Sequence, residues 1–274
     1  AVKKKEKIVI YTDYDADGIL AGAIIWETLY SQRARVLPFV PNRLTDGYGL
    51  SKSGIDKVKK NINPRLLITV DHGINKNKEV EYAGKLGIEV IIIDHHLPPR
   101  KLPKAVIIHS TAVCATGLVW IFSNFLKGKM LKNYLDLVAI GTVADLVPLV
   151  GVNRTLVKFG LKELNKTRRI GLNALIKITG LIKGRIDSYA LSHILAPRLN
   201  ASGRLTDAMD SLRLICTKDY IRADKLANEL NAVNRNRQNL TKESTRIAYA
   251  QVSSSERIIF ISHESFHQGI IGLI

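Results

Sequence analysis

The chain has 274 residues, of which 46% are hydrophobic, so it can bury a substantial core as one large domain or as two smaller ones. Its apolar runs are too short for a membrane span or a signal peptide and its two cysteines are too few for a disulfide framework, so we expect a cytoplasmic protein without a membrane partner. Lys and Arg total 41 against 24 Asp and Glu, and the resulting charge of +17 favours a polyanionic partner such as nucleic acid, although a generally basic proteome would also explain it.

The first 110 residues alternate between short β-branched runs and helix-like segments. We expect strands at 7–12, 35–40, 66–70, 89–93 and 105–108, and helices at 19–32, 51–61 and 76–86. The strands are too apolar to have one face in water, which is typical of a parallel sheet covered by helices. The sequence therefore predicts an α/β fold built on a parallel sheet flanked by helices.

The first strand ends in three carboxylates at every second position, Asp13, Asp15 and Asp17, followed by Gly18. Like charges this close raise one another's pKa unless a counter-charge is present, and a divalent cation such as Mg²⁺ or Mn²⁺ supplies one to oxygen ligands. A calcium-binding loop fits less well, because it needs further ligands and a downstream Glu. Gly18 is expected at a strand-to-helix turn that needs either a positive φ or a close backbone approach.

Two later strands are followed directly by polar residues of the same kind, namely Asp71 after one and Asp94, His95 and His96 after the other. In a parallel sheet these ends meet at one edge, where open α/β folds bind their ligands. A single Asp after a strand is usually a turn or a helix cap. Three strands that end in this way predict a shared site.

The middle of the chain is expected to be mostly helical over residues 116–149. Asp145 lies there among apolar neighbours, where an unpaired carboxylate is costly, so metal ligation explains its position better than helix capping does. Residues 153–215 are expected to form shorter helices joined by turns. Residues 219–251 contain neither Pro nor Gly and predict one long helix with a narrow apolar stripe.

A small segment at 197–204 carries Arg198, Asn200 and Arg204. As a flexible loop it would suit planar recognition of phosphate oxygens, although such a loop is often an ordinary surface turn. Residues 151–250 hold 19 Lys and Arg against 8 Asp and Glu, a surplus of 11, so most of the positive charge lies apart from the acidic cluster.

Beyond the long helix, a serine run at 253–255 precedes a predicted strand at 257–261. We therefore divide the chain into a first domain at 1–215, a connecting helix at 216–255 and the beginning of a second α/β domain at 256–274.

The candidate ligands suffice for two divalent ions bridged by one carboxylate: Asp13, Asp15, Asp17, Asp71, His95 and Asp145. Two such ions clamp the attacking and leaving oxygens of an in-line phosphoryl displacement. The candidate catalytic residues are Asp15, Asp17, Asp71 and His96; His96 either donates to the phosphate or the leaving group, or orients a ligand through a hydrogen bond. Zinc fits less well because the set is dominated by oxygen and lacks Cys.

The order of these motifs resembles that of the DHH phosphoesterases. The four motifs of that family stand in order as Asp15-Ala16-Asp17-Gly18, Val70-Asp71-His72-Gly73, Asp94-His95-His96 and Gly141-Thr142-Val143-Ala144-Asp145. Within the family the chain is similar to archaeal-like RecJ-type single-strand-specific exonucleases with a truncated C-terminal domain. This second resemblance rests on residues 13–18, 197–204 and 266–272.

The resemblance implies that Asp15, Asp17, Asp71, His95 and Asp145 hold two Mn²⁺ or Mg²⁺ ions, with Asp71 as the bridge and Asp13 as a further ligand or a neighbour of one. It implies 5′→3′ degradation of single-stranded DNA or RNA, with substrate contacts from His96, Arg198, Asn200, Arg204 and His267. The three units become a DHH catalytic domain, a connecting helix and the beginning of a DHHA1-like domain. Replication or repair proteins are the partners that such a function implies.

Two alternatives stay open. A short-oligonucleotide or nucleotide phosphoesterase of the same superfamily would share the metal site, but the basic helix and the arginine segment favour a polymer. A replication scaffold related to RecJ would have lost ligands, whereas every expected ligand is present. Tyr11 stands where pyrophosphatase-type members carry a metal-binding His, which argues against pyrophosphate as the substrate, and His72 either adds to the site or packs.

Overall fold

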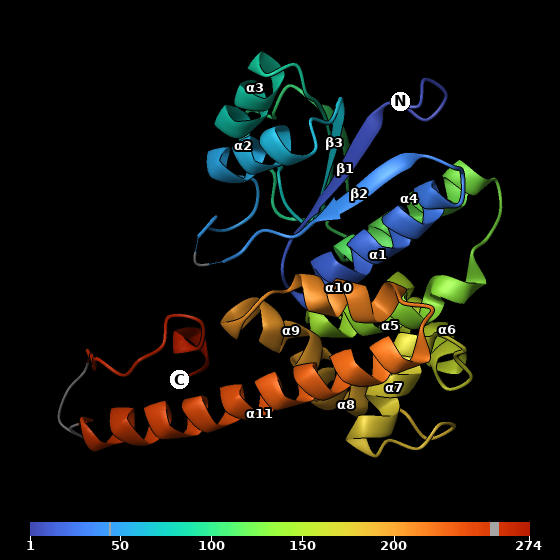
Figure 1. The fold of residues 1–274 in the computed structure, drawn as a ribbon. Helices are drawn as coiled ribbons and strands as arrows, with labels where there is room; N and C mark the ends of the chain where they lie inside the picture. Colours follow the sequence, from blue (N-terminus) through green and yellow to red (C-terminus); the bar gives the residue numbers. More distant parts are fainter. Residues whose placement is uncertain (44, 253–257) are drawn as a thin grey trace.

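A five-stranded parallel sheet forms the core of the N-terminal half in the computed structural model, which describes residues 1–43, 45–252 and 258–274 (Figure 1). Its strand order is β2-β1-β3-β4-β5. The strands are β1 (Lys7–Thr12), β2 (Arg35–Phe39), β3 (Leu66–Val70), β4 (Glu89–Asp94) and β5 (Val106–His109). The α/β fold predicted from the sequence is therefore confirmed.

Helices cover both faces of this sheet, and β1 shows why. Ile8 and Ile10 face a core formed with α1 (Ala16–Tyr30) and α4 (Ala115–Lys127), whereas Val9 and Tyr11 face a core formed with α2 (Lys52–Asn61) and α3 (Asn77–Lys85). Successive residues of a strand point to opposite faces, so a strand that is apolar throughout needs a cover on both sides. Figure 1 shows α2 and α3 on one side of the sheet and α1 and α4 on the other.

A second layer of helices packs on the far side of α1. α1 is buried almost all round because it lies between the sheet and this layer. The helices of the layer are α5 (Leu135–Ala144), α6 (Gly151–Leu164), α7 (Ile170–Thr179), α8 (Ser188–Ala190), α9 (Ala196–Leu205) and α10 (Met209–Cys216). The layer also contains a 3-10 helix at Lys132–Tyr134 and a π-helix at Leu191–Leu195, and a further 3-10 helix, Ile271–Leu273, lies in the C-terminal segment.

The long helix predicted at 219–251 is α11 (Tyr220–Ala250), which is about 46 Å long at 1.5 Å per residue. Asp219 caps it by accepting a hydrogen bond from the Arg222 N–H (2.8 Å). Leu226 and Leu230 bury its first half against the helical layer, whereas the buried positions farther along are small or polar. Figure 1 shows the helix running from this layer towards the C-terminal segment.

Two predicted elements differ from the structure. The segment 197–204 is not a flexible loop but lies within α9, since Pro197 stands in the first turn of that helix, where proline's missing N–H is harmless. The predicted strand at 257–261 begins outside the described residues, and residues 258–261 form no strand. A strand forms only by pairing with a neighbour, and the five strands of the described sheet do not reach this segment.

The three-unit division stays a prediction, and its second boundary lies outside the described residues.

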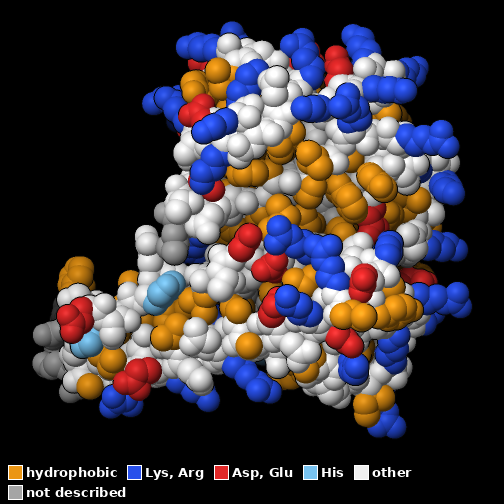
Figure 2. All heavy atoms as spheres, viewed as in Figure 1, with side chains coloured by type: hydrophobic (Ala, Val, Ile, Leu, Met, Phe, Trp, Pro, Cys, Tyr) orange, Lys and Arg blue, Asp and Glu red, His pale blue; other side chains and the backbone are white. Residues whose placement is uncertain are grey.

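No helix among residues 1–43, 45–252 and 258–274 is long and apolar enough to cross a membrane. Figure 2 shows Lys and Arg side chains spread around the periphery of one face, with apolar side chains gathered towards its middle. The positive charge on this face is therefore not confined to one patch.

Candidate metal centre

The carboxyl ends of three neighbouring strands converge at one edge of the sheet. Thr12 pairs with Val70 and Val70 with Ile93, so the residues that follow leave the sheet at the same level. The Asp13 N–H donates to the Val70 carbonyl (3.1 Å) and the Asp71 N–H to the Ile93 carbonyl (2.9 Å), which extends both ladders by one residue. The register thus places the predicted ligands side by side.

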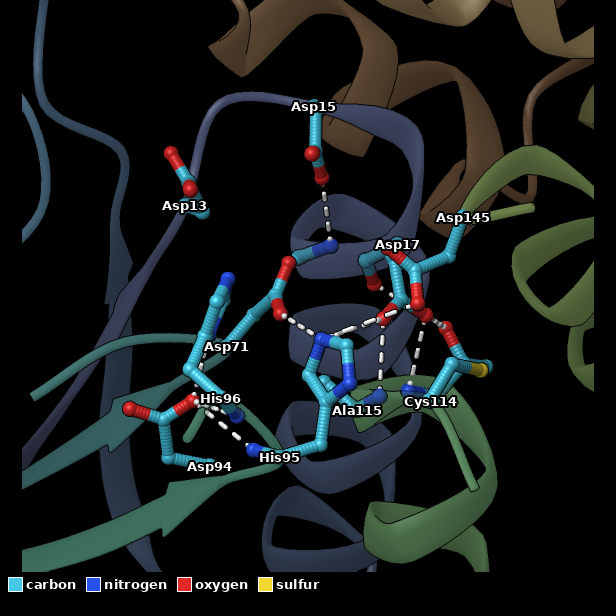
Figure 3. Close-up of polar contacts among 12 residues, drawn as sticks. Asp13, Asp15, Asp17, Asp71, Asp94, His95, His96, Cys114, Ala115 and Asp145 are labelled. Atoms are coloured by element: carbon cyan, nitrogen blue, oxygen red, sulfur yellow. Dashed lines mark hydrogen bonds and ion pairs between the residues drawn. The ribbon is translucent and has the colours of Figure 1, made fainter. Parts of the chain in front are cut away.

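His95 lies at the centre of the resulting cluster. Its Nε2 is 3.0 Å from Asp71 Oδ1, 3.7 Å from Asp145 Oδ2 and 3.9 Å from Asp17 Oδ2. Three sets of donor atoms each lie within 4.8 Å of one another: Asp17, His95 and Asp145; Asp71, His95 and His96; and Asp13, Asp15 and Asp71. Figure 3 shows Asp13 and Asp145 at opposite ends, with Asp71 and His95 between them.

Asp17 is fixed by the first turn of α4. The Ala115 N–H donates to Asp17 Oδ2 (2.7 Å), the Thr116 N–H donates to Oδ1 (2.9 Å), and the Thr116 hydroxyl also donates to Oδ1. The positive end of a helix dipole favours a carboxylate at this place. A side chain at Gly141 would lie 2.9 Å from Asp17 Oδ1, so only glycine lets α5 come close enough to bring Asp145 to the cluster.

Helix capping explains Asp15 in part but does not explain Asp145. Asp15 caps α1 by accepting a hydrogen bond from the Gly18 N–H (3.0 Å). Asp145 stands at the C-terminal end of α5, where the helix dipole disfavours a negative charge. A Cβ at Gly18 would lie 2.7 Å from the Asp13 Cβ, so the glycine serves a close approach rather than a positive φ.

Asp71 has an unusual backbone. Its φ is +69°, in the left-handed region that Asp and Asn tolerate better than other side chains with a Cβ. The residue is buried, and although its Oδ1 lies 3.0 Å from His95 Nε2, neither atom makes a hydrogen bond of good geometry among the described residues. A buried carboxylate oxygen and a buried imidazole nitrogen that face each other without a hydrogen bond are suited to ligate a shared cation.

The carboxylates disfavour one another's charge. Burial, followed by the neighbouring charge of Asp15, raises the pKa of Asp13 to about 7. Burial and the charge of Asp17 raise the pKa of Asp145 to about 7, and burial and the same charge raise the pKa of Asp71 well above its usual value. Burial lowers the pKa of His95, which keeps the imidazole neutral and able to ligate. The donor set therefore fits divalent cations that prefer oxygen and accept imidazole, such as Mn²⁺ and Mg²⁺.

Asp94 is a residue of this site that our list of candidates omitted. Its Oδ1 accepts hydrogen bonds from His96 Nδ1 (2.7 Å) and from the N–H groups of His95 (2.8 Å) and His96 (3.2 Å), and its Oδ2 accepts one from the Ile74 N–H (2.9 Å). Burial would raise the pKa of Asp94, but these bonds lower it to about 2. The hydrogen bond to Asp94 raises the pKa of His96. Asp94 could have been found from the sequence, because it stands at the end of β4 directly before His95 and His96.

A cavity of about 200 Å³ adjoins the Asp13 end of the cluster. It is lined by Asp13, Tyr14, Asp15, Arg43, Tyr48, Asn200 and Arg204. The Arg43 guanidinium carbon lies 5.5 Å from the centre of the Tyr14 ring, which meets the Tyr48 ring edge-on at 6.1 Å. Arg43 and Tyr48 were missed from the sequence, although they follow β2, whose carboxyl end belongs to the same sheet edge.

The four predicted substrate residues outside the cluster have different surroundings. Arg204 lines the cavity, whereas Arg198 is outside it and donates to Asn231 Oδ1 (3.0 Å) and the Ile194 carbonyl (2.6 Å). Asn200 Oδ1 accepts from the Ala16 N–H (2.6 Å), which fastens α9 to the first turn of α1. His267 lies in the C-terminal segment, which contacts Arg204 through the bond from Arg204 Nη1 to the Gly269 carbonyl (3.3 Å).

Tyr11 and His72 belong to the core on the other face of the sheet. Their rings meet edge-on at 5.2 Å, and the Tyr11 hydroxyl donates to the Gly49 carbonyl (3.3 Å). His72 is buried, and burial lowers its pKa to about 4. Of the two roles considered for His72, the structure supports packing.

Comparisons with known proteins agree with this geometry. Residues 7–142 match the DHH family, N-terminal domain. Over its whole length the chain is 34% identical to a Bacillus subtilis protein named single-stranded-DNA-specific exonuclease RecJ and 32% identical to its namesake from Thermus thermophilus. It spans 36% and 42% of the lengths of these relatives. Both organisms are bacteria, so the archaeal-like character expected from the sequence stays a prediction.

Two solved structures resemble the whole chain. A crystal structure of exonuclease RecJ bound to manganese superposes with a TM-score of 0.91 at 32% identity, and the chain covers 72% of it. The structure of RecJ from Thermus thermophilus in complex with Mn²⁺ gives a TM-score of 0.87 at 30% identity, and the chain covers 42% of it.

Proposed function

The chain belongs to the RecJ group of the DHH family, and on that premise we propose that it hydrolyses phosphodiester bonds of single-stranded DNA from the 5′ end, with two Mn²⁺ or Mg²⁺ ions. The observation that carries this proposal is the convergence of buried carboxylates around His95. No Lys or Arg among residues 1–43, 45–252 and 258–274 forms an ion pair with these carboxylates. Protein groups alone leave this charge uncompensated, so cations from solution are expected.

The donor sets suggest how two ions would be shared. Asp17, His95 and Asp145 would hold one ion, Asp13 and Asp15 would hold the other, and Asp71 would bridge them, since its carboxylate belongs to sets on both sides. When bound, such ions neutralise the phosphate, act as Lewis acids and make water a better nucleophile.

His96 has the geometry of a phosphate-facing donor. The Asp94 carboxylate can only accept, so the hydrogen bond between them fixes the proton on His96 Nδ1 and directs Nε2 away from Asp94. The raised pKa of His96, caused first by this bond, favours the protonated ring. A protonated Nε2 can donate to a phosphate oxygen or to the departing oxygen.

The cavity at the Asp13 end suits a phosphate group and an adjoining base. Arg43 and Arg204 supply guanidinium donors, and Tyr14 and Tyr48 supply aromatic surface. A strand whose terminal phosphate occupies this cavity would be cut one nucleotide from its end, which supports an exonuclease, and the 5′→3′ polarity rests on family membership. RNA would fit the same groups and is the second candidate substrate.

Two other functions are less well supported. A nucleotide phosphoesterase of the superfamily would use the same centre, but the long basic helix and the arginine-lined cavity favour a polymer. A replication scaffold would not need the complete donor set found here. Replication or repair proteins as partners rest on family membership alone.

Digestion of 5′-labelled single-stranded DNA and RNA of equal sequence, with Mn²⁺ and with Mg²⁺, tests the proposal. We expect mononucleotides to be released from the 5′ end of DNA in a metal-dependent reaction. A circular single strand is the control, because an exonuclease leaves it intact. Cleavage of dinucleotides far faster than of twenty-residue strands would instead identify a short-oligonucleotide hydrolase.

A further inference from the structure

Two leucines beside the metal centre are almost fully exposed. Leu97 follows His96 directly and is 80% exposed, and Leu146 follows Asp145 directly and is 81% exposed. One exposed leucine is ordinary on a protein surface. Two of them, each adjacent to a residue of the same cluster, call for an explanation in terms of the site.

Leu146 is held in place against the preference of its backbone. Asp145 stands at the C-terminal end of α5, and Leu146 occupies the next position with a φ of +59°. This is the left-handed position after a helix where glycine is usual, because a Cβ there crowds the neighbouring carbonyl. An exposed leucine gains nothing from the core, so the stability of the fold does not account for it.

Side-chain amides fasten the backbone near both leucines. Asn153 Nδ2 donates to the carbonyls of Pro148 (3.1 Å) and Ala112 (3.2 Å), and thereby joins the chain after Leu146 to the segment before α4. Asn75 Nδ2 donates to the Leu97 carbonyl (3.2 Å). The leucines are therefore presented from anchored positions.

The two ends of the metal centre thus differ in chemistry. The Asp13 end adjoins arginines and tyrosines, whereas Leu146 borders the Asp145 end, and Figure 3 shows Asp13 and Asp145 on opposite sides of the cluster. A nucleic-acid strand alternates charged phosphates with largely apolar nucleosides. The arginine end suits a phosphate, and the leucine end suits a base or sugar.

We propose that Leu97, next to the phosphate-facing His96, and Leu146, next to Asp145, are positioning residues, which contact the nucleoside that follows the scissile phosphate. The inference rests on the proposed function and assigns the second nucleotide of the strand to the apolar border. Leu146→Gly separates this role from folding, because glycine removes the side chain and suits the left-handed backbone. Leu97→Ala is its counterpart on the other segment.

The test compares two 5′-phosphorylated single-stranded oligonucleotides with Mn²⁺, one normal and one abasic at its second nucleotide. We expect the unaltered protein to show a kcat/KM about tenfold higher on the normal strand. Relative to the unaltered protein, each variant should lose about tenfold in kcat/KM on the normal strand and almost nothing on the abasic strand. Stabilisation by Mn²⁺ should stay unchanged, and thermal stability should be unchanged in Leu97→Ala and at least as high in Leu146→Gly, because glycine suits the left-handed backbone. Phe125→Ala is the control, because Phe125 is also 81% exposed but lies at the far end of α4.

The outcomes separate the two proposals. Equal losses on both strands, or no loss on the normal strand, would overturn the assignment of the leucines while leaving the nuclease proposal in place. If the unaltered protein cleaves neither strand with Mn²⁺, the proposed function fails, and the inference that rests on it fails with it.

Discussion

Buried or half-buried carboxylates lie at both ends of the antiparallel pair α1 and α5, but among the described residues Lys and Arg form ion pairs with them at one end alone. At one end, Arg169 donates to both oxygens of Glu27 (2.7 and 3.3 Å), and Asp136 accepts from the Thr167 hydroxyl (2.7 Å). At the other end, Asp17 meets the region of Gly141 and Asp145. There, His95 is the basic side chain that the described residues provide within ion-pair distance.

The comparison separates a structural network from a ligand site. Where the chain supplies its own Arg, the carboxylates are satisfied and the network ties α7 to α1. At the end where no Lys or Arg of the described residues forms an ion pair, burial and mutual repulsion raise the pKa values of the carboxylates, and the folded state has to bind protons or cations. The pattern of compensation, rather than the number of acidic residues, identifies the functional end.

Replacing Asp71 should produce the largest effect. Asp71→Asn keeps a residue that tolerates the left-handed backbone but removes the charge proposed to bridge two ions, so we expect kcat/KM on single-stranded DNA to fall about 10³-fold. In chelator, the variant should be at least as stable as the parent protein, because one of the repelling carboxylates is gone. Steady-state kinetics and thermal unfolding measure the two effects. Unchanged activity would refute the bridging role.

Replacing Arg169 should lower stability, whereas replacing Asp71 should lower activity. Arg169→Met leaves the half-buried Glu27 with only Lys218 at 4.0 Å and removes the nearby positive charge from the buried Asp136, so we expect the free energy of unfolding to fall by about 3 kcal/mol. Chemical denaturation measures this loss. The double variant with Glu27→Gln should recover part of it, because the stranded charge is removed as well. A loss below ~0.5 kcal/mol would show that the network contributes little to stability.

Mn²⁺ should stabilise the folded protein by binding at the cluster around His95, and the size of this stabilisation should depend on pH. At a hundredfold excess over Kd, Mn²⁺ should add about 2.7 kcal/mol to the free energy of unfolding. Burial and neighbouring charges raise the folded-state pKa of Asp13 and Asp145 to about 7, above the ordinary carboxyl value. Without metal, the folded state therefore holds more protons than the unfolded state between about pH 4 and 7, so stability from these groups falls as pH rises through that window.

Ligation requires the ionised carboxylates, so Mn²⁺ binding releases protons and strengthens as the pH rises towards 7. The difference between melting temperatures with Mn²⁺ and with chelator should therefore grow from pH 5 to pH 7.5. Taking this difference at each pH cancels groups that do not interact with the metal. A difference that shrinks with rising pH would contradict ligation by these carboxylates.

The sequence predicted the sheet and the acidic residues well, because both depend on local and regular features. A β-branched run that ends in Asp indicates a strand and its exit, and the parallel register then brings the exits together, as the pairing of Thr12 with Val70 shows. Asp145 was expected to be a ligand because an unpaired carboxylate among apolar residues needs a partner, and the structure brings it to within 3.7 Å of His95 Nε2, while its ligand role stays a prediction.

The rest depended on contacts between distant segments. Arg198 and Arg204 look alike in the sequence, but α9 turns Arg204 towards the cavity and Arg198 towards Asn231. The use of Asn200 as a fastener for Ala16 joins positions 184 residues apart, and no local pattern signals it. Arg43 was missed because its loop carries no motif that marks it, although the carboxyl end of β2 points to the same edge.

Asp94 offers the smallest and finest test of the comparison, because it is a buried carboxylate compensated by a histidine rather than by Arg or by an ion. Asp94→Asn keeps the size of the side chain but removes the charge that stabilises the protonated ring of His96. We expect kcat/KM to fall about tenfold, the usual scale for losing a partner that orients a functional residue. The pKa of His96 should fall, so the alkaline limb of the pH–rate profile should move to lower pH if the protonated ring donates to the phosphate.

Asp56→Asn is the control, because Asp56 is an exposed carboxylate that accepts a hydrogen bond from the Tyr82 hydroxyl. This variant should change neither kcat/KM nor the pH–rate profile. A tenfold loss with an unshifted profile would mean that Asp94 holds His96 in place without setting its protonation.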